Sequence, residues 1–171
     1  MFSLPSLRND PFSWQTALSL ALASKLAYES SSTIENVTTS GWGFTGYQPL
    51  DQGDTQGFIA IADGVVLIAF RGTESLGDWI DNLDVLPEAR PYGNVHSGFM
   101  EAFRRVEHDI RAALPAGAVA GRKVWLTGHS LGGALATITA VELGSALPVT
   151  GIYTYGQPRL GNSAVRGFFG R

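Results

Sequence analysis

The segment Lys123-Val-Trp-Leu-Thr-Gly-His-Ser-Leu-Gly-Gly133 decides the fold, because it changes from strand character to helix character within a few residues. Apolar and β-branched residues predict a strand over 123–127, and an Ala-rich run predicts a helix over 131–144. Between them, Gly128-His-Ser-Leu-Gly132 matches G-x-S-x-G, the pattern of a sharp strand-to-helix turn that presents a serine. Glycine is expected at both ends of this pattern, because side chains there would collide with the approaching strand and helix.

The flanking sequence supplies further strands and helices in alternation. Two apolar runs joined at Asp63-Gly64 indicate a β-hairpin, and its second run does not alternate, so we expect that strand to be buried on both faces. Strands alternating with helices favour parallel pairing, and the predicted class is α/β, a mostly parallel sheet with flanking helices. The other predicted elements are an opening helix over 11–28, strands over 55–62, 65–70 and 149–155, and an amphipathic helix over 99–114.

Composition narrows the classes of function. The chain has 171 residues, a net charge of −3, and 44% hydrophobic against 16% charged residues, which predicts a single folded domain with ample core material. No basic stripe is present to neutralise phosphates, so no nucleic-acid partner is expected. No apolar run approaches the roughly 20 residues of a membrane span. Without cysteine there is no disulfide framework and no thiolate nucleophile.

Neither a cofactor nor a metal ion is expected. Asp78, Asp81 and Asp84 lie on one side of a short segment, a pattern more typical of a solvated helix face than of a calcium loop. The apolar run that begins at Ala17 follows no basic segment, so no signal peptide is predicted. The location stays open between the cytoplasm and secretion by a non-classical route.

Ser130 is the candidate nucleophile of an acyl transfer. At the start of a helix, developing negative charge lies beside the positive helix N-terminus, and the N–H of Leu131 can point at an oxyanion. A second donor is expected from the neighbouring strand end Phe70-Arg-Gly-Thr73, where Thr73 offers a backbone N–H and a hydroxyl. The plainer alternatives are a helix N-cap serine at 130 and a Gly-Thr turn that closes the strand.

A short apolar stripe follows that strand end. Its members recur at helical spacing and are Leu76, Trp79, Ile80, Leu83 and Leu86. About two turns of helix would be marginal in isolation, which suits a segment that moves over a cleft. A fixed surface helix has the same pattern and remains the alternative.

Five motifs together resemble the class 3 (fungal-type) lipase family of the α/β-hydrolase superfamily. In the family's order and spacing they are Phe70–Thr73, Asp78-Trp79, Val95–Phe99, Thr127–Gly133 and Tyr153–Asn162. The resemblance implies a serine carboxylic ester hydrolase, a lipase or esterase, that forms an acyl-enzyme on Ser130. Its substrates would be acylglycerols or related lipid esters, met at a lipid–water interface.

The same resemblance assigns roles to individual residues. It implies that Thr73 and Leu131 form the oxyanion hole and that His96 is a structural hydrogen-bonding residue near the site. It also implies that 74–90 is a lid over the active site. The lid residues expected to meet substrate are Leu76, Trp79, Ile80 and Leu83.

The expected partners of the serine are missing from the sequence. On this fold the order along the chain is Ser, then Asp or Glu, then His, yet the residues after Ser130 contain no His and no Asp. Their one acid, Glu142, would lie about 18 Å along the helix at ~1.5 Å per residue, too far to orient a base. We therefore expect 1–171 to be the N-terminal portion of one hydrolase domain, incomplete at its C-terminal side and close to inactive alone.

This expectation leaves the strand over 149–155 as an apolar edge. Such an edge invites pairing, so a missing C-terminal segment, a second chain or self-association is expected to cover it. The alternative function is a catalytically degenerate hydrolase fold that serves as a lipid- or protein-binding module.

Overall fold

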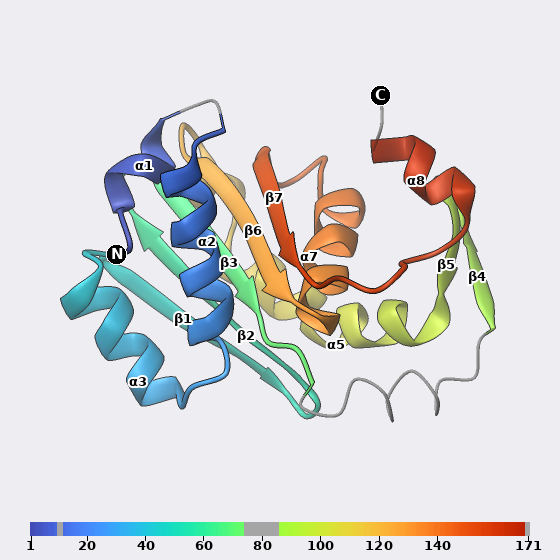
Figure 1. Ribbon diagram of the computed structural model, residues 1–171, viewed down its shortest axis with the longest axis horizontal. Helices are drawn as coiled ribbons and strands as arrows, with labels where there is room; N and C mark the ends of the chain where they lie inside the picture. The colour runs from blue at the N-terminus through green and yellow to red at the C-terminus, as the bar shows by residue number, and fades with distance from the viewer. Residues whose placement is uncertain (10–11, 74–85, 170–171) are drawn as a thin grey trace.

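The computed structural model describes residues 1–9, 12–73 and 86–169, and a five-stranded sheet runs through its centre (Figure 1). Its strand order is β1-β2-β3-β6-β7, with β1, β2 and β3 paired antiparallel and β3, β6 and β7 parallel. A separate antiparallel pair consists of β4 and β5. The strands are β1 (Gly46–Gln52), β2 (Thr55–Ala62), β3 (Val65–Phe70), β4 (Pro87–Arg90), β5 (Gly93–His96), β6 (Lys123–His129) and β7 (Val149–Tyr155).

Helices cover both faces of this sheet. The α2 helix crosses one face, whereas α5 and α7 lie on the other (Figure 1). Two apolar clusters fill the layers, one beneath α5 and α7 and one between the sheet and the N-terminal helices. The described helices are α1 (Leu4–Arg8), α2 (Trp14–Leu26), α3 (Ser31–Asn36), the π-helical turn η1 (Val37–Gly41), α5 (Ser97–Ala113), α6 (Ala116–Val119), α7 (Leu131–Glu142) and α8 (Ser163–Phe169).

The hairpin and the amphipathic helix form as predicted. Gly64 takes a positive φ of +74° in the two-residue turn between β2 and β3, and all six residues of β3 are buried. In α5 the predicted apolar stripe faces the core, with Phe99, Phe103, Val106 and Ile110 all buried. The α/β class and the flanking helices are confirmed. The sheet is mixed and not mostly parallel as predicted, because the hairpins that join β1, β2 and β3 pair these strands antiparallel.

The buried face of α2 combines small hydroxyl residues with Leu20 and Leu26. Trp14 and Leu18 are 83% and 44% exposed, whereas Thr16, Ser19 and Ser24 are buried. The small hydroxyl residues let α2 lie close to β6, where the hydroxyls of Ser24 and Thr127 are hydrogen-bonded at 2.8 Å. Because these polar atoms are satisfied at short range, α2 can bury hydroxyl residues beside Leu20 and Leu26.

Several element bounds differ from the sequence prediction. The opening helix starts at Trp14 with Ser13 as its N-cap rather than at residue 11, because the Ser13 hydroxyl accepts the N–H of Thr16. Residues 87–90, the last part of the expected lid, form strand β4, which pairs with β5. Strand β1 and the helices α1, α3 and α8 had no clear signal in the sequence.

The three parallel strands end at one edge of the sheet. Phe70 at the end of β3 pairs with Gly128 of β6, and His129 pairs with Tyr155 at the end of β7. Carboxyl ends of parallel strands are where α/β proteins build their sites. This edge therefore holds the turn around Ser130 and the strand end that leads to Thr73.

Candidate active site

Ser130 is held in a strained backbone conformation. Its φ of 57° and ψ of −125° make it the one non-glycine residue with positive φ among those the structure describes. The Ser130 N–H donates to the Tyr155 carbonyl at 2.8 Å, which anchors the turn to the end of β7. The strain is retained because the flanking strand and helix fix the turn from both sides.

Glycines permit this close approach, as the sequence predicted. A Cβ on Gly128 would overlap the carbonyl group of Gly132, and a Cβ on Gly132 would overlap the carbonyl of Phe70. The head of α7 thereby packs directly on the ends of β3 and β6. A larger residue at either position would push the helix away from the strands.

The two hydroxyls predicted to act in chemistry are both buried without a partner. Ser130 Oγ and Thr73 Oγ1 have no hydrogen bond among the described residues, and the one other buried hydroxyl there without a partner is that of Thr139. Ser130 does not use its hydroxyl to cap α7, so the helix-cap alternative does not describe this serine. Buried polar groups are nearly always paired, so each of these exceptions needs an explanation.

The strand end and the serine turn are in contact through Gly72. A Cβ built on Gly72 would lie 3.2 Å from Ser130 Cβ and 2.6 Å from the His129 carbonyl. Thr73 is the next residue along, and Leu131 is the first residue of α7, where the N–H has no acceptor inside the helix. The structure thus brings the regions of all three predicted site residues together.

None of the three histidines is hydrogen-bonded to Ser130 Oγ. His129 Nδ1 is hydrogen-bonded to the Tyr28 hydroxyl at 2.8 Å, and His108 is exposed on α5. His96 is the N-cap of α5, and its Nδ1 accepts the N–H of Gly98 at 3.3 Å. Burial lowers the pKa of His96, because the charged imidazolium loses solvation. This structural use of His96 agrees with the sequence expectation.

Glu142 is engaged far down α7. Its carboxylate accepts bonds from Arg90 Nε at 3.0 Å and from the Tyr92 hydroxyl at 2.5 Å. Burial and the Glu142 carboxylate raise the pKa of Tyr92, so this phenol stays protonated as a donor. Glu142 therefore fastens the β4–β5 hairpin to α7 and is not available to orient a catalytic base.

The predicted lid residues Leu76, Trp79, Ile80 and Leu83 lie outside the described residues, as do Asp78, Asp81 and Asp84. Leu86, the last member of the stripe, is described and is 68% exposed. In the described ranges no group of three or more acidic, histidine or cysteine residues could hold a metal ion. None of the helices within those ranges has the length and apolar character needed to cross a membrane.

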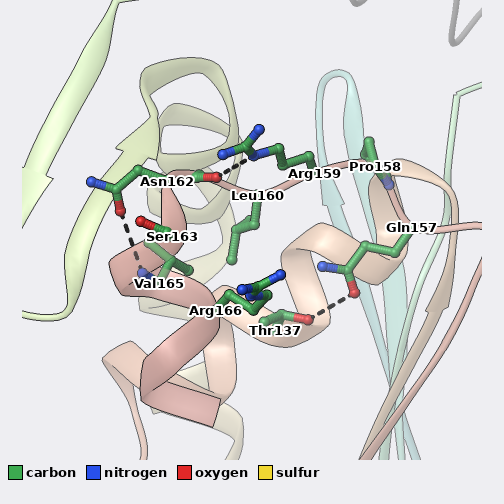
Figure 2. A pocket seen from close by; sticks show the side chains of 10 residues that line it. Thr137, Gln157, Pro158, Arg159, Leu160, Asn162, Ser163, Val165 and Arg166 are labelled. Carbon is green, nitrogen blue, oxygen red and sulfur yellow. Dashed lines mark hydrogen bonds between the residues drawn. The ribbon is translucent and has the colours of Figure 1, made fainter. Parts of the chain in front are cut away.

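A separate cavity of about 640 Å³ lies between α7 and α8 (Figure 2). The connection from Gln157 to Ser163 forms much of its wall, and the Thr137 hydroxyl bonds to Gln157 Oε1 at 3.0 Å. Ser130, Thr73 and Leu131 do not line this cavity, so it is distinct from the serine site. This cavity was not predicted from the sequence, where its signal is the polar run that follows the apolar strand over 149–155.

A sheet of this order, with a strained serine between a parallel strand and a helix, defines a protein of α/β-hydrolase type. The model of the family Lipase (class 3) matches residues 67–170, and the chain belongs to that family. Secreted mono- and diacylglycerol lipase 1 of Fusarium solani is 36% identical over 60% of this chain and 32% of its own length. For a lipase of Rhizomucor miehei the identity is 34%, over 65% of this chain and 34% of the relative.

The fold comparison agrees with the family. The structure of Rhizomucor miehei triacylglyceride lipase superimposes with a TM-score of 0.69 at 25% identity, over 92% of this chain and 68% of that chain. The chain spans about a third of the length of the Fusarium and Rhizomucor relatives in the sequence comparison. The predicted class 3 lipase family and α/β-hydrolase-like fold are confirmed.

Proposed function

We propose that Ser130 is the nucleophile of a carboxylic ester hydrolase that acts on acylglycerols or related lipid esters. The observation that carries the proposal is the strained, buried serine whose Oγ has no partner among the described residues. A serine with a purely structural role would use its hydroxyl for a cap or a core hydrogen bond. The names of the relatives, a mono- and diacylglycerol lipase and a triacylglyceride lipase, support the substrate class.

The proposed reaction uses three groups of this chain and requires a base in addition. Ser130 Oγ bonds to the ester carbonyl carbon as a base takes its proton, and the carbonyl oxygen becomes an oxyanion. The Thr73 hydroxyl and the Leu131 N–H donate to that oxyanion. The C–O bond to the alcohol then breaks, and the base returns its proton to the alcohol. Water repeats the sequence on the acyl-enzyme and releases the acid.

The base and its orienting carboxylate are proposed to come from polypeptide that covers the β7 side of the sheet. β7 is an edge strand of the described sheet, and its side chains are mostly half-buried. Beside it, Phe12 is 59% exposed and stacks on Tyr153 of β7 at 6.1 Å between ring centroids. With Trp14 and Leu18 also exposed, this side has an open strand edge next to an uncovered apolar surface.

The covering polypeptide could belong to the same gene product, a second chain or another copy. In each case the 171-residue chain by itself should turn over a soluble p-nitrophenyl ester only slowly. An oxyanion hole and binding without a positioned base supply roughly 10³ to 10⁴ over water. A lid over 74–86 that opens at a lipid surface would add interfacial activation.

The nucleophile is tested with an alkyl fluorophosphonate and mass spectrometry. We expect the probe to modify the wild-type chain at Ser130 over hours, and Ser130→Ala to abolish the modification. Ser163→Ala, which removes an exposed hydroxyl on α8, is the matched control and should label like wild type. Modification that persists in Ser130→Ala contradicts the assignment. A chain that binds lipid vesicles without any Ser130 labelling would instead favour the binding-module alternative.

A further inference from the structure

We infer that Tyr28 is a positioning residue that holds the oxyanion-hole strand end against the serine turn; the inference rests on the proposed function. Tyr28 follows α2 in the chain, and its hydroxyl is hydrogen-bonded to His129 Nδ1 at 2.8 Å. His129 is the residue directly before the candidate nucleophile. A tyrosine outside the recognised motifs is therefore bonded to the serine turn.

The Tyr28 hydroxyl also occupies the space that a side chain on Gly72 would need. A Cβ on Gly72 would overlap Tyr28 Oη and would approach both the His129 carbonyl and Ser130 Cβ. The Tyr28 hydroxyl and the serine turn therefore lie together against the side of Gly72 where a side chain would project. Because Thr73 is the next residue, a shift of Gly72 would move the Thr73 hydroxyl relative to Ser130.

A second contact fixes the same strand end from the ring side of Tyr28. The Arg71 guanidinium lies over the Tyr28 ring, 5.7 Å from its centroid. Arg71 is further held by Gln56, which accepts from the Arg71 side chain at 2.7 Å and from its main-chain N–H at 2.9 Å. Tyr28 therefore touches Arg71, Gly72 and His129 together, and links the two segments that carry the proposed oxyanion donors.

This arrangement explains how Thr73 can keep a hydroxyl that has no partner among the described residues. The residues around it are fixed by contacts that do not use its Oγ1, so the hydroxyl stays available for a ligand oxygen. Hydrogen bonds to an oxyanion weaken steeply with misalignment. Loss of the Tyr28 hydroxyl should therefore slow reaction at Ser130 with little effect on initial probe binding.

The test measures phosphonylation of Ser130 in the 171-residue chain at several probe concentrations, which separates the maximal rate from the half-saturating concentration. We expect Tyr28→Phe to lower the maximal rate about tenfold and to leave the half-saturating concentration within twofold. Tyr92→Phe removes a hydroxyl bond to Glu142 at the other end of α7 and is the matched control. It should label at the wild-type rate.

A double-mutant cycle with Thr73→Val separates positioning of Thr73 from other effects. If Tyr28 acts through Thr73, Tyr28→Phe should cost less than twofold in the Thr73→Val background. An undiminished tenfold loss in that background overturns the inference, as does an equal maximal rate for Tyr28→Phe and wild type. A wild-type chain that is not labelled at Ser130 overturns the proposed function itself, and this inference with it.

Discussion

The strained backbone at Ser130 predicts that this position lowers the stability of the fold. A non-glycine residue in a sparsely populated region of φ/ψ space costs about 1–3 kcal/mol. Its hydroxyl is also buried without a partner among the described residues, and leaving such a group unsatisfied costs about 1–3 kcal/mol. Ser130→Ala removes the hydroxyl but keeps the Cβ, whereas Ser130→Gly removes both costs. The two substitutions therefore separate the burial cost from the backbone strain.

The expected order of stability is Ser130→Gly, then Ser130→Ala, then wild type. Glycine gives back about 0.4–1 kcal/mol through the greater freedom of the unfolded chain, so its net advantage over alanine is about 1 kcal/mol. For a chain of this size that difference raises the Tm by roughly 2–4 °C. Urea unfolding at one protein concentration measures the difference in the free energy of unfolding, with the midpoints compared at a common slope.

The control for this prediction is Ala140→Gly in the same helix. There the backbone is helical, so glycine should lower the stability by about 0.5–1 kcal/mol relative to alanine. The sign of the alanine-to-glycine difference must reverse between positions 130 and 140. A Ser130→Gly midpoint at or below that of Ser130→Ala would refute the argument that strain is stored at the serine.

Two further predictions concern the packing of the turn and the cap of α5. Gly128→Ala should destabilise the fold by more than about 2 kcal/mol in urea unfolding, because its Cβ would overlap backbone atoms of Gly132. Gly117→Ala in α6 is the control. Its Cβ would meet nothing within 4 Å, so this substitution should be neutral or stabilising. Burial lowers the pKa of His96, so the unfolded chain takes up this proton at a higher pH than the folded chain. The free energy of unfolding should therefore fall as the pH drops below about 6.5. His96→Asn keeps an N-cap acceptor, so the decrease in Tm between pH 7.5 and pH 5.5 should be smaller in this variant than in wild type. Equal pH dependence in the two proteins would contradict the assigned role of His96.

Local sequence was enough to predict the elements that carry their own signals. The turn at Asp63-Gly64 needs a residue that accepts positive φ, and α5 has an apolar stripe at helical spacing, so both were correctly predicted. The G-x-S-x-G turn was found because its glycines are required by steric contact within a few residues of the serine. The ends of β3 and β6, which carry the candidate site residues, lie together as expected of neighbouring parallel strands.

Local sequence could not predict burial and pairing that depend on distant partners. Trp14 and Leu18 of α2 are large and apolar yet exposed, whereas Ser24 is buried because its hydroxyl pairs with Thr127 of β6. The strand over 87–90 had no signal, because four residues with no apolar alternation become a strand only when β5 pairs with them. A periodic pattern shows that a helix has an apolar side but does not show what that side contacts.

The sequence by itself determined the α/β class, the family, and the turn that holds Ser130, because each is encoded in short runs whose backbone conformation depends on neighbouring residues. Only the tertiary structure decided that Tyr28 meets His129 and Gly72, and that β7 is an edge of the described sheet beside exposed aromatic residues. Tyr28 and His129 are separated by about a hundred residues along the chain. Contacts across such a separation arise from the packing of α2 on the sheet, and no local pattern of hydrophobicity or propensity encodes them.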